Sequence, residues 1–490
     1  MMVNLVNLHR LVELKDDVEI SEKYVRYLVN MDNENKYRHN EIVYINQLLN
    51  YLDLSIEDAD SFFHSYNIPQ LNKEMDLIKI CKDLCINIEI KSGNVTKEKI
   101  ARQLVQNNHY LKMLNREVIC VTYIADSNEI YLLNKNELID IISKGDLIQI
   151  LKGKKGEYVN LDEVFSPKNI LVSPLNDTDK FINGNYLLTE YQEMIKNSIL
   201  LIDRKTTSFV GITGNAGTGK TLLTYDIAKH MSKYSKVLII HGGILCDGHK
   251  YLDKKLSNVD IYSAKYFRYK KIIGYDLIVL DEAHRIYTTL INKVIEYIEE
   301  SNCMCLFCYD EKQTLSKSEI RRDSVKIIKE KVGDKLYKLT NKIRTNKEIN
   351  NFIYCLQDLN RYKEDYVFNN IKLIYIGNKI KANEYAKYIC EVDGYIYITF
   401  TSSFYDSNID YQYSDINTHS VIGQEFEKVC MLLDDNFMYI DGRLTAKTHP
   451  NPDYLFEKLL YQGLTRTRSK LLLIVTTKNL LENIFKLLKH

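Results

Sequence analysis

The stretch SFVGITGNAGTGKTLLTY, residues 208–225, decides the fold of the larger part of the chain. An apolar run precedes a glycine-rich turn and a helical pattern, so the stretch predicts a strand, a loop and a helix in that order. Glycines let backbone N–H groups surround a phosphate, Lys220 adds positive charge, and Thr221 offers a hydroxyl to Mg²⁺. The residues predicted to bind the phosphates of ATP are Gly214, Asn215, Ala216, Gly217, Thr218, Gly219, Lys220 and Thr221.

Apolar runs of strand length recur after this stretch. Seven more follow between residues 236 and 477, from KVLIIHG to KLLLIVTT. Most do not alternate polar with apolar residues, which is typical of parallel strands covered by helices on both faces. Helical patterns lie between most of them. The pattern predicts a doubly wound α/β architecture, and eight strands over about 300 residues indicate two RecA-like lobes.

Length and composition exclude several classes of protein. A chain of 490 residues is too long for one hydrophobic core, and 45% hydrophobic residues suffice for several ordinary domains. The formal net charge is +1, so a polyanion must be bound by local patches. The ten cysteines show no paired spacing, and Cys303, Cys305 and Cys308 lie in an apolar run typical of a core strand rather than a zinc site.

Targeting signals and domain boundaries are also read from composition. No stretch reaches the roughly 18 uninterrupted apolar residues that a membrane span needs, and acidic residues interrupt the N-terminus before a signal-like core forms. We expect a cytoplasmic protein with no membrane partner, which could form a homo-oligomer. Turn-forming residues gather between about residues 150 and 185. The expected domains are residues 1–150, a linker at 151–185, and lobes at 186–340 and 341–490.

Asp281 and Glu282 end the apolar run DLIVLDE, residues 276–282. An unpaired carboxylate at the end of a buried strand is costly, and a bound metal ion removes that cost. Asp281 is therefore predicted to hold Mg²⁺ together with Thr221. Glu282 is predicted to polarise the attacking water, as phosphoryl transfer to water requires.

Further segments follow in a fixed order. They are CYDEKQTLS with Asp310 and Gln313, LTNKIRTNKEINNFI with Arg344, NTHSVIGQEFEKVCMLLDD with Gln424, and LLYQGLTRTRSKLLLIV with Arg466 and Arg468. Upstream, LTEYQ ends at Gln192. Although DEAH alone suggests the other large helicase superfamily, this order resembles the motifs of superfamily-one helicases, in the compact form of the helicase region of Schlafen-like proteins. The resemblance covers residues 165–490 approximately.

The resemblance implies a role for each matching residue. Gln192 would read adenine, Gln313 would couple the γ-phosphate to the second lobe, and Gln424 would contact the nucleotide. Arg344 and Arg466 would reach across the cleft between the lobes as arginine fingers, because the transition state gathers negative charge on the γ-phosphoryl oxygens.

Two points stay open within this resemblance. Arg468 is either a second finger or a surface residue. About 60 residues separate Thr221 from Asp281, and about 75 separate Arg344 from His419. These spacings leave little room for the inserted subdomains that split a duplex in larger members. The sequence is therefore as compatible with translocation, or with ATP-gated clamping on a strand, as it is with unwinding.

The segment IYSAKYFRYKK, residues 261–271, interleaves cations with aromatic rings. Cations neutralise phosphates and rings stack on bases, a mode suited to single strands. Lys265, Arg268 and Lys270 are therefore predicted to contact nucleic acid. The alternative is a solvated helix whose aromatic side chains point inward.

The N-terminal region carries a second pattern, EMDLIKICKDLCINIEIKSG, residues 74–93. If Lys82 and Asp83 form a two-residue hairpin loop, paired residues sum to 165 and Asp76 lies opposite Glu89. Lys91 projects from the same face as Glu89, since strand side chains alternate. Asp76 and Glu89 are predicted to bind Mg²⁺ or Mn²⁺, and Lys91 to orient water or stabilise charge, in a metal-dependent phosphodiesterase.

This spacing resembles the PD-(D/E)XK nuclease core, although Met75 replaces the usual proline. In that resemblance Glu41 matches the acidic residue of the first core helix and would join the metal site. Gln106 and Tyr110, with Gln103 nearby, resemble the Gln-x-x-x-Tyr element of helicase-linked nucleases and would contact nucleic acid. Asp83 competes with Asp76 as a ligand, but its place in the turn argues against it.

Together these patterns predict a restriction-endonuclease-like α/β domain followed by two RecA-like lobes with doubly wound parallel sheets. The predicted function is an ATP-dependent translocase or helicase coupled to a Mg²⁺-dependent nuclease that acts on DNA more than RNA. Resemblance to bacterial nuclease–helicase fusions implies antiviral defence. The alternatives are a translocase or ATP-gated sensor whose N-terminal domain binds without cleaving. A P-loop kinase or GTPase is disfavoured, because no guanine-reading element is present.

Overall fold

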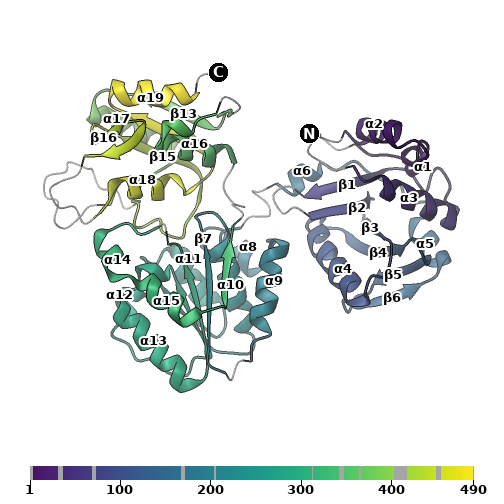
Figure 1. Ribbon diagram of the computed structural model, residues 1–490, viewed down its shortest axis with the longest axis horizontal. Helices are drawn as coiled ribbons and strands as arrows, with labels where there is room; N and C mark the ends of the chain where they lie inside the picture. The colour runs from purple at the N-terminus through teal and green to yellow at the C-terminus, as the bar shows by residue number, and fades with distance from the viewer. Residues whose placement is uncertain are drawn as a thin grey trace. The chain divides into compact units, whose positions relative to one another are not determined.

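The computed structural model describes residues 4–30, 37–68, 73–166, 172–203, 206–311, 313–340, 347–363, 366–401, 416–447 and 454–488. The chain divides into two compact units, Met1–Ile170 and Leu171–His490 (Figure 1). We call these unit 1 and unit 2, and each is described by itself. Within the described residues, no helix combines the length and the apolar character that crossing a membrane requires.

Unit 1 contains a six-stranded sheet in the order β1-β2-β3-β4-β5-β6. Only β3 and β4 are parallel, because α4 connects them across one face. The strands are β1 (Phe62–Ile68), β2 (Lys73–Ile80), β3 (Leu84–Lys91), β4 (Glu117–Ile124), β5 (Glu129–Leu133) and β6 (Ile139–Ile142). The observed pairs of β2 and β3, from Leu77 with Ile88 to Ile80 with Cys85, sum to 165 and confirm the predicted register.

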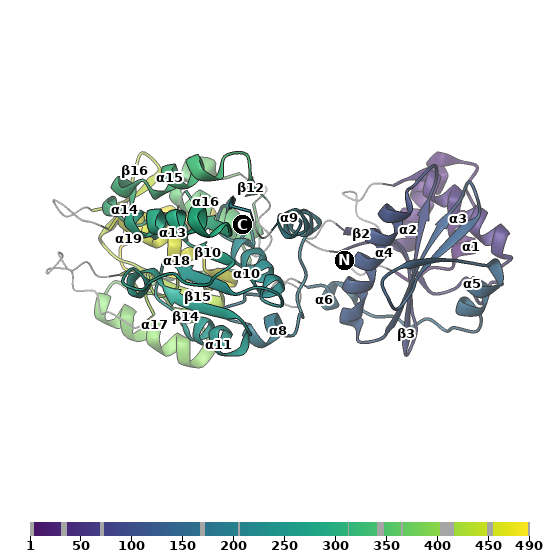
Figure 2. The ribbon, with the colours of Figure 1, turned by 90° about the horizontal axis from the view of Figure 1, so that it is seen from below.

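Helices cover both faces of this sheet. The helices α1 (Leu8–Val12), α2 (Val18–Val29), α3 (His39–Leu52) and α5 (Lys144–Leu151) share one apolar core with even-numbered residues of β3 such as Ile86 and Ile88. On the other face lies α4 (Lys97–Leu111), which begins where the Thr96 side chain accepts a hydrogen bond from the Lys99 backbone (Figures 1 and 2). Odd-numbered residues of β3 therefore point toward α4.

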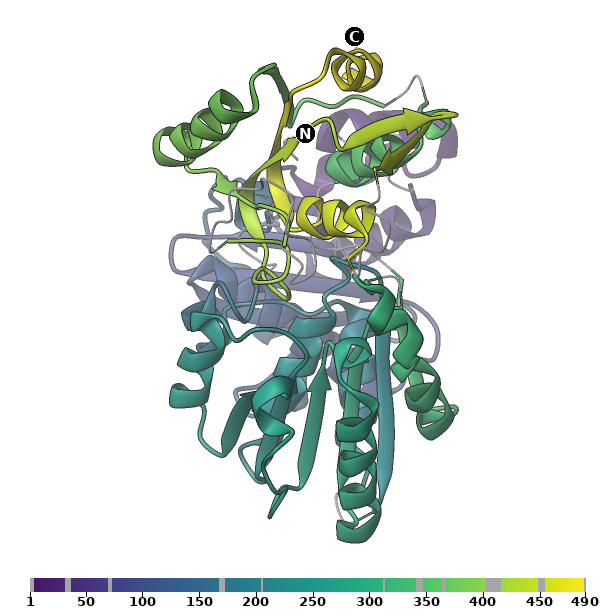
Figure 3. The same cartoon turned by 90° about the vertical axis from the view of Figure 1, so that its left-hand side faces the viewer.

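The first lobe of unit 2, residues 172–340, is built on a six-stranded parallel sheet in the order β12-β7-β11-β10-β8-β9 (Figure 3). Its strands are β7 (Ser208–Gly214), β8 (Val237–His241), β9 (Val259–Ser263), β10 (Leu277–Asp281), β11 (Met304–Tyr309) and β12 (Leu336–Leu339). The chain runs from β7 to β8 past two strands and later returns, so the carboxyl ends of β7, β10 and β11 meet at one edge, where parallel sheets bind ligands.

Helices flank this sheet on both sides. One face packs on α8 (Thr178–Ile182), α9 (Glu190–Leu200), α10 (Lys220–Met231) and α11 (Asp247–Lys255). The other packs on α12 (Ala264–Phe267), α13 (Thr288–Ser301) and α15 (Ser324–Val332). In α13 the buried Leu290, Ile291, Val294 and Ile298 recur at helical spacing and form one apolar stripe. The three clustered cysteines are buried, Cys305 and Cys308 in β11 and Cys303 directly before it, as the apolar run predicts.

The second lobe, residues 347–488 as described, has a four-stranded parallel sheet in the order β13-β18-β15-β14. Its strands are β13 (Ile371–Tyr375), β14 (Ile396–Tyr397), β15 (Phe426–Leu433) and β18 (Thr467–Val475). Its helices are α16 (Lys347–Gln357), α17 (Lys379–Asp393), α18 (Phe456–Leu464) and α19 (Lys478–Leu488), and a hairpin pairs β16 (Phe437–Ile440) with β17 (Arg443–Ala446).

Residues 151–185, expected as a linker, are partly built into the two units. In unit 1 the ring of Phe165 lies 6.0 Å from the ring of Tyr66, beside α6 (Leu161–Val164). In unit 2 Leu175 and Phe181 are buried in the core of the first lobe. Each unit therefore extends into the expected linker.

Candidate active sites

The phosphate loop joins the end of β7 to the start of α10. Gly217 and Gly219 have φ values of 76° and 83°, a left-handed conformation that glycine adopts without strain. A Cβ atom on Gly214 would lie 2.5 Å from the carbonyl oxygen of Leu339 and 2.7 Å from Oγ1 of Thr218. The glycines are therefore required by backbone shape and packing as well as by the phosphate-binding pattern.

Lys220 occupies the centre of this loop. Its Nζ donates hydrogen bonds to the carbonyl oxygens of Gly214 (2.8 Å) and Asn215 (3.0 Å) and lies 3.4 Å from Oδ2 of Asp310. Thr221 follows in the first turn of α10 and is half-buried. The ammonium is thus held inside the loop, with the carboxylate at the end of β11 as its counter-charge.

Gln192 lies beside the same loop but contacts protein. Its Oε1 accepts from the Thr189 backbone at 3.0 Å in the capping box of α9, and its Nε2 donates to the Thr218 carbonyl at 3.2 Å. Gln192 is buried, and it supports the phosphate loop from behind. Its role in reading adenine stays a prediction.

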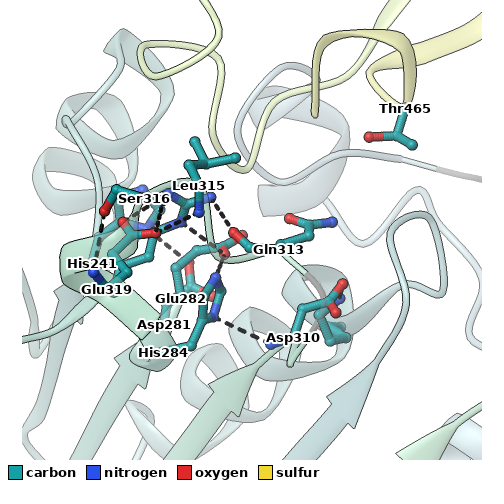
Figure 4. Close-up of polar contacts among 12 residues, drawn as sticks. His241, Asp281, Glu282, His284, Asp310, Gln313, Leu315, Ser316, Glu319 and Thr465 are labelled. Atoms are coloured by element: carbon teal, nitrogen blue, oxygen red, sulfur yellow. Dashed lines mark hydrogen bonds and ion pairs between the residues drawn. The ribbon is translucent and has the colours of Figure 1, made fainter. Parts of the chain in front are cut away.

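Asp281 and Glu282 lie at the carboxyl end of β10, close to His284 and Asp310 (Figure 4). Burial would raise the pKa of Glu282, but positive charge from His284, Arg285 and Lys220 lowers it to about 2, so this carboxylate stays ionised. Glu282 has a φ of 52°, a strained conformation for a residue other than glycine. Oδ1 of Asp281 is buried without a hydrogen-bond partner in the described part of the chain, which fits a cation site. Oε2 of Glu282 instead lies 3.4 Å from Nε2 of His284 and 3.7 Å from Nε of Arg285.

Arg285 and Glu319, which the sequence interpretation missed, shape the loop that carries Gln313. Arg285 donates to the Gln313 carbonyl at 2.9 Å and lies 3.3 Å from Oε1 of Glu319. Glu319 also accepts from the Leu315 backbone at 2.6 Å. The arginine directly after DEAH was the available signal, but its partner lies 34 residues away.

The same loop joins the two lobes of unit 2. Leu315 is buried in the apolar core of the second lobe. Its carbonyl oxygen accepts from the Leu455 backbone at 3.0 Å, and Lys458 donates to Oγ1 of Thr314 at 2.9 Å. A segment that begins at Asp310, the partner of Lys220, therefore ends inside the other lobe.

Arg466 lies between the lobes of unit 2 and is buried. Its Nε donates to the Gln462 carbonyl at 3.2 Å and its Nη1 to the Gln424 carbonyl at 3.1 Å. Burial lowers the pKa of Arg466, while the charges of Glu425 and Glu282 raise it. The charge of Glu282 therefore reaches Arg466. The second predicted finger, Arg344, lies outside the described residues.

Arg468 lies in an ion-pair cluster, and its role as a second finger or a surface residue stays a prediction. Its guanidinium lies 3.2 Å from Asp177, 3.3 Å from Glu425 and 3.7 Å from Glu427. Three carboxylates therefore hold it in a half-buried ion-pair cluster. Arg468 ties the second lobe to the segment that opens unit 2.

Gln424 lines a cavity of about 830 Å³ within unit 2 rather than the phosphate loop. The other walls come from the first turn of α11, including Cys246 and Gly248, and from Leu175 and Ser420. Nε2 of Gln424 donates to the Ser420 carbonyl at 2.8 Å. The prediction that Gln424 contacts the nucleotide gains no support from this position.

The predicted nucleic-acid segment forms an exposed surface of cations stacked on rings. Nζ of Lys270 lies 3.9 Å from the ring centroid of Tyr262, and Cζ of Arg268 lies 4.7 Å from that of Tyr269. Lys265 and Arg268 are exposed, and Tyr269 is 79% exposed. Since Tyr269 points outward, the alternative with all aromatic rings inward does not describe this segment.

In unit 1 the predicted Asp76, Glu89 and Lys91 come together. Nζ of Lys91 lies 3.7 Å from Oδ2 of Asp76 and 3.4 Å from Oε2 of Glu89. Asp76 accepts from the Ile90 backbone at 2.8 Å. His64 on β1 lies beside Asp76, and burial lowers the pKa of its imidazole to about 4, so it is neutral.

Glu89 is surrounded by amide donors, of which the sequence interpretation named Gln103 without this role and missed Asn87 and Asn107. Asn107 donates to its Oε1 at 2.8 Å, Asn87 donates to the same oxygen at 3.2 Å, and Gln103 donates to Oε2. Burial and the charge of Asp76 raise the pKa of Glu89 to about 7, against the charge of Lys91. The spacing of Gln103 and Asn107, one helical turn apart on the face toward β3, was the available signal.

The remaining predicted residues of unit 1 are placed less favourably. Glu41 pairs with Arg38 at 2.6 Å, and burial raises its pKa with a further contribution from Asp76. Gln106 is half-buried on α4. Tyr110 is only 2% exposed, because the helical period turns it inward with Leu104 and Leu111. Its predicted contact with nucleic acid is therefore wrong in this structure.

Comparison with known families places one match within unit 2. Residues 207–371 match the family model described as Schlafen group 3, DNA/RNA helicase domain. The match covers about a third of the chain and supports a helicase domain in this region. No curated protein matches the chain.

Solved structures with some likeness to the chain include three Pif1 structures. Unliganded Pif1 from Bacteroides sp is 12% identical, with a TM-score of 0.34 over 61% of this chain and 96% of that one. Pif1 helicase from Bacteroides in complex with ADP-AlF3 and ssDNA is 14% identical, with a TM-score of 0.33 over 60% and 94%. Pif1 helicase from Candida albicans is 11% identical, with a TM-score of 0.32 over 61% and 99%. These likenesses are too distant to bear on function.

Proposed function

We propose that the chain is an ATP-dependent nucleic-acid translocase or helicase joined to a Mg²⁺-dependent nuclease that acts on DNA in preference to RNA. The observation that carries the proposal is the meeting of Lys220, Asp281, Glu282 and Asp310 at the carboxyl ends of neighbouring parallel strands. The helicase-domain match over residues 207–371 supports the same reading. The nuclease rests on the convergence of Asp76, Glu89 and Lys91.

The residues of the phosphate site divide the work of ATP hydrolysis. Lys220 and the loop N–H groups bind the phosphates, and Glu282, ionised at neutral pH, orients water toward the γ-phosphate. Asp281 and Thr221 would hold Mg²⁺, which supplies positive charge to the phosphate oxygens. Arg466 then adds charge from the second lobe. Since Arg466 now donates to backbone carbonyls, it must turn toward the phosphate when nucleotide binds.

Coupling to nucleic acid follows from the loop at 310–316. Its first residue pairs with Lys220 and its sixth, Leu315, is buried in the second lobe. A change at the phosphate site therefore moves the lobes, and a strand that contacts either lobe changes the phosphate site. Lys265, Arg268 and Lys270 offer phosphate contacts, and Tyr269 offers a face for stacking, so the substrate class is a single strand.

The nuclease chemistry belongs to the face of unit 1 that meets α4. Asp76 and Glu89 supply the oxygen ligands that Mg²⁺ prefers, and Lys91 would stabilise the charge that develops on the phosphate. Glu89 binds a cation only in its ionised form. Because its pKa is about 7, proton loss must accompany binding.

The test is to incubate purified protein with labelled single- and double-stranded DNA and RNA, with and without ATP and Mg²⁺, and to measure product lengths and phosphate release together. We expect strand-stimulated phosphate release that Lys220→Ala abolishes and cleavage that Lys91→Ala abolishes. The exposed Lys233→Ala and Lys99→Ala serve as matched controls. If the wild-type protein released no phosphate with any of these strands present, the proposed translocase or helicase activity would be refuted.

A second candidate function is an ATP-dependent translocase whose N-terminal domain binds nucleic acid without cleaving it. Glu89 already accepts from Asn87, Asn107, Gln103 and Lys91, which together occupy the roughly four lone-pair positions of a carboxylate. A cation must displace at least one of these donors. This observation favours a non-cleaving domain that binds nucleic acid, and it is supported if Lys91→Ala weakens binding while no condition yields product.

The biological role that fits the first candidate is defence against foreign nucleic acid in bacteria. The proposal rests on the pairing of a strand-cutting site with an ATP-driven one in a single chain, as in the fusions that the sequence resembles. Plaque counts from cells that express the wild-type protein, the Lys220→Ala variant and the Lys91→Ala variant test it. Equal phage titres on all three would remove this role.

A further inference from the structure

Tyr287, an exposed ring at the start of α13, has two guanidinium groups over it. The residue directly precedes α13, and 49% of its surface is exposed. Cζ of Arg322 lies 4.3 Å from the centroid of the Tyr287 ring, and Cζ of Arg268 lies 5.8 Å from the same centroid. Arg268 directly follows α12, and Arg322 ends α14 (Lys317–Arg322), on the same side of the first lobe (Figure 1). Three segments that are separate in the sequence therefore meet at one ring.

Neither of the two guanidinium groups is neutralised by a carboxylate. Within the part of the chain that the structure describes, Arg268 and Arg322 form no ion pair, and Nε of Arg322 donates instead to the uncharged Ser318 carbonyl at 3.1 Å. Two like charges over one ring repel each other. An anion that binds beside them relieves this repulsion.

A pair of similar geometry in the second lobe lacks this property. Cζ of Arg361 also lies 4.3 Å from a ring centroid, that of Tyr354, which is 51% exposed. Its Nε, however, lies 3.2 Å from Oδ2 of Asp358, so the charge of this arginine is neutralised. A guanidinium group on an exposed tyrosine is therefore not in itself a site for anions, and the lack of a paired carboxylate distinguishes Arg268 and Arg322.

Four more cations lie in or next to the same segments. Lys265, Lys271 and Arg321 are exposed, and like Lys270 they form no ion pair with a carboxylate among the described residues. Since the formal net charge of the chain is only +1, this surface concentrates positive charge locally. The phosphodiester backbone of a nucleic-acid strand, with its regularly spaced charges, matches several neighbouring cations better than a single small anion does.

A tyrosine ring leaves the edge of a stacked guanidinium group open. Arginine stacks on an aromatic ring through its flat face, while its N–H groups point outward in the plane and fit two oxygens of a phosphate. Stacking also limits the rotamers of the long side chain, so less entropy is lost when a phosphate binds. Tyr287 is therefore suited to position Arg268 and Arg322, and their guanidinium groups are suited to bind phosphates.

Two contacts hold the segment before the Tyr287 ring against α14 and the residues that follow it. Nη1 of Arg285 lies 3.3 Å from Oε1 of Glu319, and Oγ of the buried Ser324 donates to the Ile286 carbonyl at 2.8 Å. Because one bond lies on each side of the end of α14 in the sequence, the ring and this end of the helix are held together. The two segments therefore keep their positions without a bound strand.

We propose that Arg268, Tyr287 and Arg322 form a phosphate-binding site for the backbone of a nucleic-acid strand. The two arginines bind the phosphates, and Tyr287 is a positioning residue. The site rests on the proposed function and deepens it, because Tyr287 follows Glu282 by five positions, with the short turn η2 (Ala283–Arg285) between them. Strand binding thereby has a second route to ATP hydrolysis besides the loop at 310–316.

Equilibrium binding tests the site independently of hydrolysis. Full-length protein is titrated, in EDTA and without nucleotide, against fluorescein-labelled oligo(dT) and oligo(U) of about 20 nucleotides at salt concentrations between about 50 and 300 mM. We expect Arg268→Ala and Arg322→Ala each to weaken binding about fivefold and to reduce the slope of log affinity against log salt concentration by about 0.7, the value for one phosphate contact of a single strand. The losses should be equal for the two strands, because both carry the same phosphates.

Substitutions at the ring test its positioning role. Tyr287→Ala frees both guanidinium groups and should weaken binding about threefold, whereas Tyr287→Phe keeps the ring and should bind like the wild type. Arg361→Ala and Tyr354→Ala are the matched controls from the second lobe and should also keep wild-type affinity. All variants should unfold at the wild-type temperature. An equal loss in Tyr287→Phe and Tyr287→Ala would overturn the positioning role.

The outcomes separate the phosphate-binding site from the proposed function. Wild-type affinity and salt slope in both arginine variants would overturn the site and leave the proposed function standing. A loss confined to one kind of strand would overturn the assignment to backbone phosphates. Binding that depends on the site, by a protein that releases no phosphate from ATP, would refute the proposed hydrolysis and leave the site intact. A wild-type protein that binds neither strand would overturn both.

Discussion

Lys220 and Asp310 form an ion pair, with 3.4 Å between Nζ and Oδ2, at the mouth of the phosphate loop. Both side chains are buried, and the pair joins the start of α10 to the end of β11. An incoming phosphate must share Lys220 with a carboxylate of the same sign as its own charge. Asp310 is therefore paired with Lys220 before any nucleotide binds.

Replacing Asp310 with asparagine should tighten nucleotide binding and slow turnover. Loss of the negative charge removes repulsion of the phosphates and should raise affinity about fivefold, which corresponds to about 1 kcal/mol. Turnover should fall, because the loop to the second lobe loses its anchor on Lys220. Fluorescent ATP-analogue titration and phosphate release measure the two effects. The exposed Glu311→Gln is the matched control, and weaker binding in Asp310→Asn would contradict the explanation.

Replacing Arg466 with glutamine should abolish hydrolysis and spare binding. An arginine that reaches the γ-phosphoryl oxygens contributes about 10³-fold or more to turnover, whereas the ground-state complex depends mainly on the phosphate loop. Single-turnover phosphate release measures hydrolysis, and the affinity for an ATP analogue measures binding. Because Arg466 is buried and donates to carbonyls of its own lobe, thermal unfolding must be compared, with exposed Lys470→Gln as control. A loss of affinity equal to the loss of rate would indicate a structural role.

Strand cleavage should rise with pH through about 7 and then level off. Burial and Asp76 raise the pKa of Glu89 to about 7, so the carboxyl is mostly protonated at pH 6 and ionised at pH 8. Only the ionised form binds Mg²⁺, and the midpoint should therefore move below 7 as Mg²⁺ concentration increases. Cleavage rates from pH 5.5 to 8.5 at two Mg²⁺ concentrations measure this. A midpoint that does not respond to Mg²⁺ would mean that Glu89 is not a ligand.

Replacing Lys458 with alanine should weaken the stimulation of hydrolysis by single strands. Lys458 donates to Thr314 beside Leu315, so its loss loosens the attachment of the loop to the second lobe. We expect stimulation to fall about threefold, because a single hydrogen bond contributes about 0.5–1.5 kcal/mol. The exposed Lys486→Ala, also in the second lobe, should keep full stimulation. Unchanged stimulation in Lys458→Ala would show that the loop at 310–316 does not couple strand binding to ATP hydrolysis.

Local patterns in the sequence predicted the parts of the fold that depend on neighbours in the chain. The register of β2 and β3 followed from one assumption, a two-residue loop at Lys82 and Asp83, because the strand period then fixes every pair. The phosphate loop followed from the order of strand, glycines and helix. The strands β9 and β12 were missed, since they lie at the edges of their sheet and are less uniformly apolar than its centre.

The sequence could not predict contacts made between distant segments. The contacts of Arg285 with Glu319 and of His241 with His249 depend on packing that no local pattern encodes. The donors Gln103 and Asn107 on Glu89 share a helical spacing, but that spacing does not say which strand residue they face. At Tyr110 a local pattern was present but predicted the wrong environment for the side chain. A motif suggested an exposed contact, but the period of α4 placed the ring in the interior.

The burial of Leu315 in the second lobe has a consequence for how force would reach the phosphate site. The Leu315 side chain, five positions after Asp310, is buried in the second lobe and so links the phosphate site to the part of unit 2 that would be pulled. Tension on a captured strand would travel along this link toward Lys220. ATP consumption should then depend on load, and the stall force would be set by the strength of one loop.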